Sequence, residues 1–328
     1  MILAGDIGGT KTVLALYSKN KLGKLECEIE QTYVSADYPK FNDILSAFVQ
    51  TNTIVDAVCL GIAGPIVDQR CQTTNLPWLI DGKELSLKFG TNRVKLLNDL
   101  EAMAIGMLHI GADDFVELNP NAKRQNGNIA VIAAGTGLGE AILYWDGERH
   151  HPMATEGGHC DFAAQTEQQD AFLKYLRKIF NGHVSWERVL SGDGFGYIYD
   201  FLISSGFAPA CSEVPDGNNI KSAVGDRNPI ISRLGINNED PACVETVRLF
   251  VELYAAEAGN LALKCLSNGG VFIGGGIAPK IRPALENGKF LQAFTSKGRF
   301  QNMLRSQSIK LSLNPDTPLI GAANYFSD

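Results

Sequence analysis

Two glycine-rich turns, each enclosed by apolar runs, constrain the fold of this 328-residue chain more than any other feature. In the segment 2–17, two apolar runs enclose Gly8-Gly9. In the segment 129–145, two more enclose a turn at 135–139. A strand, a glycine turn and a returning strand make a β-hairpin. Each half of the chain is therefore predicted to open with such a hairpin, and the length fits two domains of about 100–200 residues, or one large domain.

The remaining periodic segments predict an α/β fold. Apolar runs predict further strands at 25–33, 55–63, 94–97 and 271–273, and helical periodicity predicts helices at 41–49, 100–108, 167–180 and 242–266. The stretch 207–240 is rich in Pro, Gly, Asn and Asp. We expect it to be a surface excursion with limited helix.

Charge and composition exclude several classes of protein. Lys and Arg number 29 against 36 Asp and Glu, a net charge of −7, which argues against nucleic acid as a partner because that grip needs many cationic contacts. No apolar run approaches about 18 residues, and the start lacks the regions of a signal peptide, so we expect no membrane and a cytoplasmic location. The seven cysteines include no C-x-x-C pair, which indicates neither a disulfide framework nor a cysteine zinc site.

The first glycine turn suits a phosphate. Gly5-Asp6-Ile7-Gly8-Gly9-Thr10-Lys11 lacks the P-loop spacing, and a strand follows it where a dinucleotide fingerprint has a helix. Glycines at a hairpin tip leave backbone N–H groups open to phosphate oxygens. Asp6 can hold a hydrated Mg²⁺ beside them. The alternative, an ordinary tight hairpin, is the commoner explanation of a lone Gly-Gly turn.

Two later glycine motifs strengthen the nucleotide interpretation. Gly135-Thr136-Gly137 offers amide and hydroxyl donors, and two phosphate turns make a nucleotide site more credible than one. The triplet 274–276 follows an apolar run, where bare backbone lets a planar ring approach. A strand-to-helix turn that needs positive φ is the alternative for this triplet.

Three polar motifs suit a polyhydroxylated ligand. Asn98-Asp99 ends an apolar run, where Asp99 can accept the proton of a substrate hydroxyl; equally, Asp99 can cap the following helix, and the spacing does not decide. Glu156 and His159 enclose two glycines, so they are predicted on a loop, where a second-shell or capping role is the alternative. Glu187 follows the N-cap candidate Ser185, and a first-turn position suffices to explain it.

In this order the segments resemble the bacterial glucokinases, the ATP-dependent group within the actin-like sugar-kinase superfamily. The resemblance rests on GDIGGTKT (5–12), TTNLPW (73–78), LLNDLEA (96–102), AAGTGLG (133–139), EGGHCDFA (156–163), HVSWERVLSG (183–192), GGVFIGGGIAPK (269–280) and KGRF (297–300). Single motifs among these are weak, but eight in register over almost the whole chain are specific.

The resemblance implies a two-domain actin-like ATPase (ribonuclease H-like) α/β fold with the active site in the interdomain cleft. It implies a small domain at 1–108, rejoined by about 312–328, and a large domain at 109–311. It also implies ATP-dependent phosphorylation of D-glucose at its 6-hydroxyl to glucose 6-phosphate, the first step of glycolysis, with domains that close on the sugar.

Residue roles follow from the resemblance by matching position. Asp99 is the expected catalytic base. The expected sugar-binding residues are Asn75, Asn98, Asp99, Glu156, His159 and Glu187. The expected ATP-binding residues are Gly5, Asp6, Ile7, Gly8, Gly9, Thr10, Gly135, Thr136, Gly137, Gly274, Gly275 and Gly276. Mg²⁺ is expected at Asp6 through water.

Departures from related groups and competing functions complete the expectations. The Cys-x-Cys-Gly pattern of a sister group of sugar kinases and repressors does not follow His159-Cys160, so we expect no zinc. A homodimer is implied by the resemblance. The alternatives are a kinase for another hexose or amino sugar and, from other classes, an actin-like ATPase that needs no sugar or a sugar sensor without catalysis.

Overall fold

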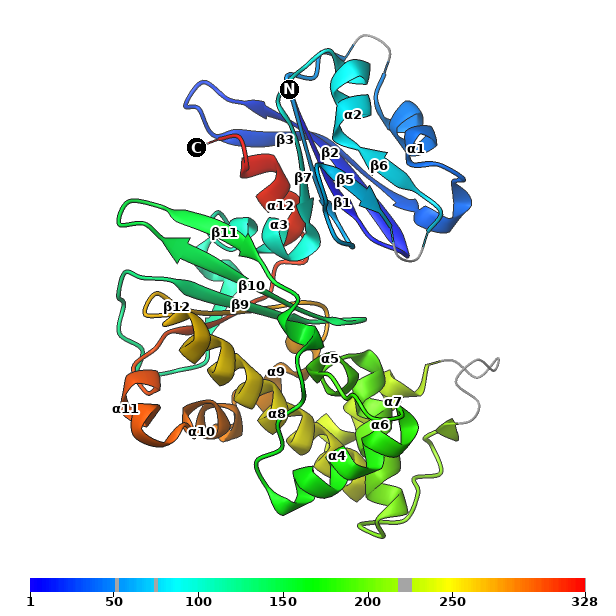
Figure 1. Cartoon of the computed structure of the whole chain (residues 1–328), viewed down its shortest axis with the longest axis vertical. Helices are drawn as coiled ribbons and strands as arrows, with labels where there is room; N and C mark the ends of the chain where they lie inside the picture. Colours follow the sequence, from blue (N-terminus) through cyan, green and yellow to red (C-terminus); the bar gives the residue numbers. More distant parts are fainter. Residues whose placement is uncertain (51–52, 74–75, 218–225, 328) are drawn as a thin grey trace. The chain divides into compact units, whose positions relative to one another are not determined.

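The structure is a computed structural model that describes residues 1–50, 53–73, 76–217 and 226–327 (Figure 1). The chain divides into two compact units. Unit 1 comprises Met1–Asp114, Pro152–Ala154 and Asn314–Asp328, and unit 2 comprises Phe115–His151 and Thr155–Leu313. Both ends of the chain therefore belong to unit 1.

A five-stranded sheet is the centre of unit 1. Its strands are β1 (Ile2–Ile7), β2 (Lys11–Lys19), β3 (Leu25–Val34), β4 (Ala57–Ile62) and β7 (Val94–Asn98). They lie in the order β3-β2-β1-β4-β7, with β1 antiparallel to β2 and parallel to β4. A separate small pair joins β5 (Arg70–Gln72) to β6 (Leu79–Asp81).

Helices cover both faces of this sheet, as the alternation along β1 requires. Leu3 and Ile7 belong to the apolar cluster shared with α1 (Phe41–Phe48) and α2 (Gly82–Phe89). Ile2 and Ala4 belong to the cluster shared with α3 (Asp99–Gly106) and α12 (Thr317–Asn324). The strand is therefore buried on two sides, which explains why its sequence reads as a continuous apolar run.

The contact between α3 and α12 is backbone on backbone. A Cβ added to Gly106 would lie 1.9 Å from the Thr317 carbonyl oxygen, and one added to Gly321 would lie 1.8 Å from the Ala102 carbonyl oxygen. Only glycine fits at both positions, so the two helices approach more closely than any side chain would allow.

Unit 2 repeats the strand order of unit 1. Its strands are β8 (Phe115–Glu117), β9 (Ile129–Ala134), β10 (Leu138–Trp145), β11 (His150–Ala154), β12 (Gly270–Gly274) and β13 (Ile309–Ser312). They lie in the order β11-β10-β9-β12-β13-β8. Here β9 is antiparallel to β10 and parallel to β12. The predicted repeat of a glycine hairpin in each half is confirmed.

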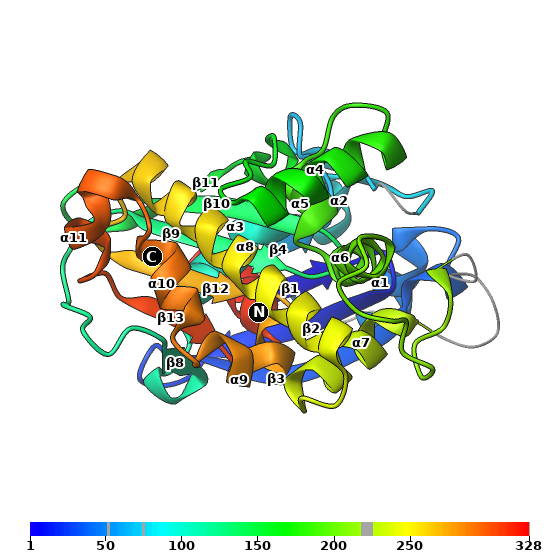
Figure 2. The same ribbon diagram turned by 90° about the horizontal axis from the view of Figure 1, so that it is seen from below.

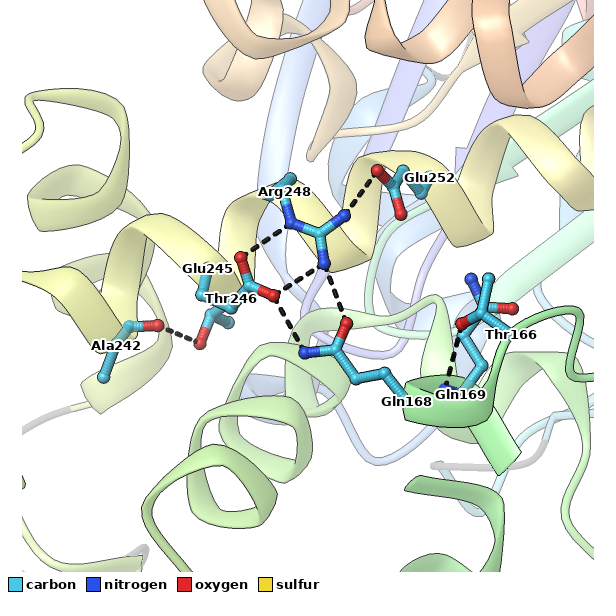
Figure 3. Close-up of polar contacts among 8 residues, drawn as sticks. All are labelled: Thr166, Gln168, Gln169, Ala242, Glu245, Thr246, Arg248 and Glu252. Atoms are coloured by element: carbon cyan, nitrogen blue, oxygen red, sulfur yellow. Dashed lines mark hydrogen bonds and ion pairs between the residues drawn. The ribbon is translucent and has the colours of Figure 1, made fainter. Parts of the chain in front are cut away.

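The long helix α8 (Pro241–Cys265) packs along β9 and β12 (Figure 2). The other helices of this unit are α4 (Glu167–Ile179), α5 (Trp186–Val189), α6 (Gly192–Ser204), α7 (Arg227–Ile236), α9 (Arg282–Leu285), α10 (Lys289–Thr295) and α11 (Gln301–Leu304). Arg248 of α8 donates to Gln168 of α4 at 2.8 Å and to Glu245 at 2.6 Å (Figure 3). This network fixes α4 against α8.

Most predicted elements are confirmed to within a few residues, and the described part of the stretch 207–240 holds limited helix, as expected. The stretch 207–240 contains α7, a ten-residue helix. Its Arg227 is buried and donates to Asp200 at 2.8 Å, so this segment is anchored in unit 2 by a charged pair that sequence periodicity does not reveal. Within the part of the chain described, no helix is both long and apolar enough to cross a bilayer.

Candidate active site

The first glycine turn closes the β1–β2 hairpin of unit 1. Ile7 pairs with Thr12, and the Gly8 amide donates to the Lys11 carbonyl oxygen at 2.9 Å. A Cβ added to Gly8 would lie 3.0 Å from that oxygen. Gly8 and Gly9 are half-buried and Thr10 is exposed, so the turn presents backbone that a ligand can reach.

A buried serine supports this turn from behind, and sequence reasoning missed it. Ser35 donates its hydroxyl to the Gly8 carbonyl at 2.8 Å and its amide to the Thr10 carbonyl at 3.0 Å. Its hydroxyl also lies 3.0 Å from that of Thr12. Because Ser35 Oγ already donates to Gly8, Thr12 is the donor in that pair. Ser35 thus holds the hairpin with three hydrogen bonds, two that it donates and one that it accepts.

The strand residues before the turn differ in exposure. Gly5 and Ile7 are buried, and a Cβ added to Gly5 would lie 2.7 Å from a methyl group of Leu60. Asp6 is half-buried. Burial raises the pKa of the Asp6 carboxyl, nearby Lys11 lowers it and nearby Asp316 raises it. A cation beside Asp6 would favour its charged form.

The strand end at Asn98 and Asp99 is a helix N-terminus. Asn98 is the N-cap of α3: its Oδ1 accepts from the Leu100 amide at 2.9 Å, and its amide donates to Glu101 at 3.0 Å. Asp99 is the first residue inside the helix, and its Oδ1 also accepts from the Leu100 amide, at 3.0 Å. The interpretation of Asp99 as the N-cap is therefore wrong, since Asn98 performs that role.

The second glycine turn, between β9 and β10 of unit 2, is packed against Glu187. The Gly135 amide donates to the Gly137 carbonyl at 2.8 Å. Glu187 Oε2 accepts from the Leu138 amide at 3.1 Å, and a Cβ added to Gly137 would lie 2.4 Å from the same oxygen. The absence of a side chain at Gly137 is what lets this carboxylate reach the turn.

Three of the expected sugar-binding side chains come together. His159 lies at the end of the short 3₁₀ turn Gly157–His159, and its Nδ1 is 3.9 Å from Glu187 Oε1 while its Nε2 is 3.8 Å from Glu156 Oε2. Glu156 and His159 are well exposed, whereas Glu187 is 30% exposed. Segments almost 30 residues apart thus gather two carboxylates and an imidazole, groups that suit a ligand with several hydroxyls.

A cavity of about 490 Å³ lies beside the second glycine turn. Its lining residues are Gly135, Thr136, Gly192, Asp193, Phe195, Asp226, Asn228, Pro229, Ser232, Gly276, Ile277, Lys280 and Ile281. The predicted nucleotide residues Gly135, Thr136 and Gly276 are therefore brought to one cavity. The residues from α7 were missed, because the expected surface excursion gave no reason to place them there.

The three glycines 274–276 lie in three different environments. Gly274 is buried at the end of β12. Gly275 has φ +82°, and a Cβ there would lie 2.3 Å from the Ala134 carbonyl oxygen. Gly276 has no atom within 4 Å of an added Cβ and lines the cavity. The positive-φ turn is therefore confirmed at Gly275, and the backbone at Gly276 is open, while its role in binding a ligand stays a prediction.

Asn75, one of the expected sugar-binding residues, lies outside the described residues. Across the described residues, no three His, Cys, Asp or Glu side chains gather as a metal-binding group. Zinc absence stays a prediction, and a hydrated Mg²⁺ held mainly by a nucleotide needs no such group.

Known proteins are similar to this chain in sequence and in fold. The profile of the family described as Glucokinase matches residues 3–328. The glucokinase of Synechocystis sp. is 38% identical over 341 residues, covering 98% of this chain and 96% of that protein. The crystal structure of a glucokinase from an Antarctic psychrotroph has a TM-score of 0.83 at 30% identity and covers 98% of this chain and 97% of its own. The glucokinase of Balamuthia mandrillaris, solved in complex with glucose, has a TM-score of 0.79 at 20% identity. The match covers 99% of this chain and 92% of that chain.

Proposed function

Because the chain belongs to the glucokinase family, we propose that Asp99 takes the proton of the 6-hydroxyl of glucose while the γ-phosphoryl group of ATP is transferred to that oxygen. The fold is that of the actin-like ATPases, and the activity is the ATP-dependent phosphorylation of glucose to glucose 6-phosphate. The proposal concerns which residues carry out this reaction. We also take the two compact units as the small and large domains of the family.

The proposed base matches what phosphoryl transfer requires. The transition state is loose, so the protein mainly orients the nucleophile and neutralises charge. The Asp99 carboxyl is oriented by the hydrogen bond from the Leu100 amide. Its neighbour Asn98 is fixed by the Leu100 amide and by its own donation to the Gly64 carbonyl at 3.3 Å. Both side chains are therefore held by backbone before a substrate arrives.

The observation that carries the proposal is the cluster of Glu156, His159 and Glu187. Its polar atoms are unlike in kind, with carboxylate acceptors and an imidazole that can donate or accept. Such a set can satisfy successive hydroxyls of glucose. A sugar without one of those hydroxyls would leave a polar group of the protein unpaired, which costs affinity.

We assign the nucleotide to the two glycine turns and the 490 Å³ cavity. Gly8 and Gly135 use their amides within the turns, so the backbone amides of Gly9 and Thr136 would bind the phosphates. The cavity beside Gly276 would take the adenosine. Support comes from the continuity of the cavity with Gly135 and Thr136, which puts a ring-sized space next to a phosphate turn.

Magnesium is part of this proposal, and the residues present fit it. Asp6 and the nearby Asp316 offer the one or two carboxylates through which proteins hold hydrated Mg²⁺. When bound with ATP, the ion supplies positive charge that neutralises the phosphate oxygens. Asp6 and Asp316 would hold its water shell, and the positive charge would counter the burial that raises the pKa of the Asp6 carboxyl.

We further propose a homodimer in the cytoplasm, with glucose and Mg-ATP as the only ligands the reaction needs. The cytoplasm is the compartment that supplies both ATP and its cofactor magnesium. The acidic net charge of −7 supports the absence of a nucleic-acid partner.

One experiment tests the proposed function. ADP formation from Mg-ATP is followed in a coupled assay with glucose, fructose, mannose, an N-acetylated amino sugar, or no sugar. We expect turnover that depends on glucose and stops when EDTA removes the metal. Faster turnover with another sugar would make the chain a kinase of that sugar. Turnover without sugar would make it an actin-like ATPase, and glucose binding without turnover a sensor.

A further inference from the structure

A buried carboxyl group lies directly beneath the turn that carries His159. Glu140 is the third residue of β10 and is 1% exposed. A Cβ added to Gly157 would lie 2.0 Å from Glu140 Oε2, so the backbone of the turn rests on this carboxyl group. Thr155 completes the contact: its hydroxyl donates to the Glu140 carbonyl at 2.9 Å and accepts from the Gly157 amide at 3.1 Å.

A second buried carboxyl group faces the first. Glu257 of α8 is fully buried, and its side chain is within hydrogen-bonding reach of Glu140. Both oxygens of Glu257 already have donors: Lys264 Nζ lies 3.0 Å from Oε1, and Asn260 Nδ2 lies 2.7 Å from Oε2. Asn260 is held in turn by Lys297 at 2.6 Å.

Glu140 lacks the donors that Glu257 has. Within the part of the chain that the structure describes, Glu140 Oε1 is buried with no hydrogen-bond partner. A buried acceptor without a donor destabilises the folded chain. Two adjacent buried carboxylates would add repulsion to that cost. A proton on Glu140 removes both problems, because the protonated group is neutral and can donate to Glu257.

We propose that Glu140 and Glu257 share one proton, and that this proton keeps the Glu156–His159 turn in the position that binds glucose. Glu140 is then a positioning residue: it touches the backbone of the turn and acts on the sugar through it. This inference rests on the proposed role of Glu156 and His159 as sugar-binding residues.

The surroundings support a proton that is lost in the alkaline range. Burial and the Glu257 carboxylate raise the pKa of Glu140 to about 8, although Lys264 lowers it. The other titratable or charged groups around the pair are Tyr254 and Cys265 of α8, Lys297, Cys160 after the turn, and Glu156, His159 and Glu187 on the sugar side. Of these groups, Glu156, His159 and Glu187 are the ones also assigned to glucose.

Loss of the proton from Glu140 lowers the stability of the folded chain. Because the pKa of Glu140 is raised above its ordinary value of 4.5, the folded chain holds a proton that the unfolded chain releases. Stability therefore falls as pH rises from the ordinary value to about 8. Above that pH, Glu140 and Glu257 repel each other beneath Gly157, and the turn must shift. If glucose binds only to the protonated form, its KM rises about tenfold between about pH 7 and about pH 9.

The test compares the wild type with Glu140→Gln, in which a neutral amide replaces the carboxyl and donates to Glu257 at every pH. The KM for glucose and kcat are measured across this range at saturating Mg-ATP. We expect the KM of Glu140→Gln to match the wild type within about twofold at pH 7 and to lack the alkaline rise. Glu148→Gln, at an exposed carboxyl between β10 and β11, is the control and should retain the rise.

The outcomes separate this inference from the proposed function. Parallel KM profiles for wild type and Glu140→Gln would overturn the shared proton, since every titratable group other than Glu140 is common to both. A wild type without glucose-dependent turnover would instead overturn the function. Calorimetric titration with glucose at the same pH values measures binding without turnover. Titration with ADP tests whether the variant is folded. Neither Glu140 nor Glu257 lines the cavity assigned to the nucleotide, so the affinity for ADP should be the same in Glu140→Gln and the wild type.

Discussion

At the scale of the residue, Asp99, the proposed base, has its carboxyl group oriented by the backbone next to it. It occupies the first position of α3, and the capping of that helix is left to Asn98. The hydrogen bond from the Leu100 amide to Oδ1 fixes the plane of the carboxyl group. Because the local structure is capped by the neighbour, a substitution at Asp99 can remove proton transfer while the helix start stays intact.

Asp99→Asn should therefore abolish turnover and spare binding. The amide keeps the shape of the side chain and an oxygen that can accept from Leu100, but it does not take up a proton. We expect kcat to fall by about 10²–10⁴-fold, with the dissociation constant of glucose changed by less than about threefold. Steady-state kinetics and calorimetry measure the two quantities.

The matched control is Glu84→Gln, at an exposed carboxyl group in the first turn of α2 in the same unit. It should leave both quantities unchanged. Turnover of Asp99→Asn near the wild-type rate would remove Asp99 from the role of base.

The residue scale also shows what the sequence could not supply. Motif matching brought forward Glu156, His159 and Glu187, and the structure gathers them. Motif matching gave no signal for Ser35. The contact of Ser35 with Gly8 depends on the register between β2 and β3, including a shift at Leu16/Tyr17. Nor did motif matching single out Glu140, since one charged residue in an apolar strand has no partner until α8 is placed against that strand.

At the scale of the element, two neighbouring glycines after β12 differ in backbone conformation and in surroundings. Gly275 combines positive φ with a close approach to Ala134, whereas Gly276 faces open space. Gly275→Ala should destabilise the protein by more than about 1 kcal/mol. Gly276→Ala should unfold at the wild-type temperature but raise the KM for ATP, because its methyl group enters the cavity. Thermal unfolding and kinetics at varied ATP distinguish the two variants.

These variants control for each other. Equal unfolding temperatures for both would contradict the strain assigned to Gly275. An unchanged KM for ATP in Gly276→Ala would contradict the assignment of the cavity to the nucleotide.

Elements with strong periodicity could be predicted, and those that depend on tertiary contacts could not. Continuous apolar runs predicted β1, β4, β9 and β12, because strands buried on both faces need them. The composition around α7 favours turns, and that helix is fixed by the pairing of Arg227 with Asp200 across a long separation in sequence. Local propensity is overridden there by a tertiary charged pair in which Arg227 is buried and Asp200 is partly exposed.

At the scale of the whole molecule, an acidic chain must bind a polyanion. The net charge is −7, and the cavity lining contains Asp193 and Asp226 against Lys280. On the proposed assignment, uncharged amides and magnesium bind the phosphates. The long-range field then repels Mg-ATP weakly, and added salt screens this repulsion.

The KM for Mg-ATP should therefore stay constant or fall by up to about twofold as KCl rises from about 0.05 M to about 0.3 M. A site built on Lys and Arg would show the opposite sign, with the KM rising. Initial rates at saturating glucose and constant free Mg²⁺ measure this dependence, and a several-fold rise in the KM would contradict binding by amides.

The close packing of α3 on α12 has a consequence for the biosynthesis of the protein. Translation delivers α12 only after all of unit 2, so Gly106 and Ala102 of α3 stay uncovered on the nascent chain until then. Unit 2 can complete its core while unit 1 waits for its last helix. A premature stop codon just before Thr317 would consequently leave a chain with every proposed ligand of ATP and glucose, but with the helix that begins at Asp99 unsupported. Such a product would be a substrate for proteases and chaperones.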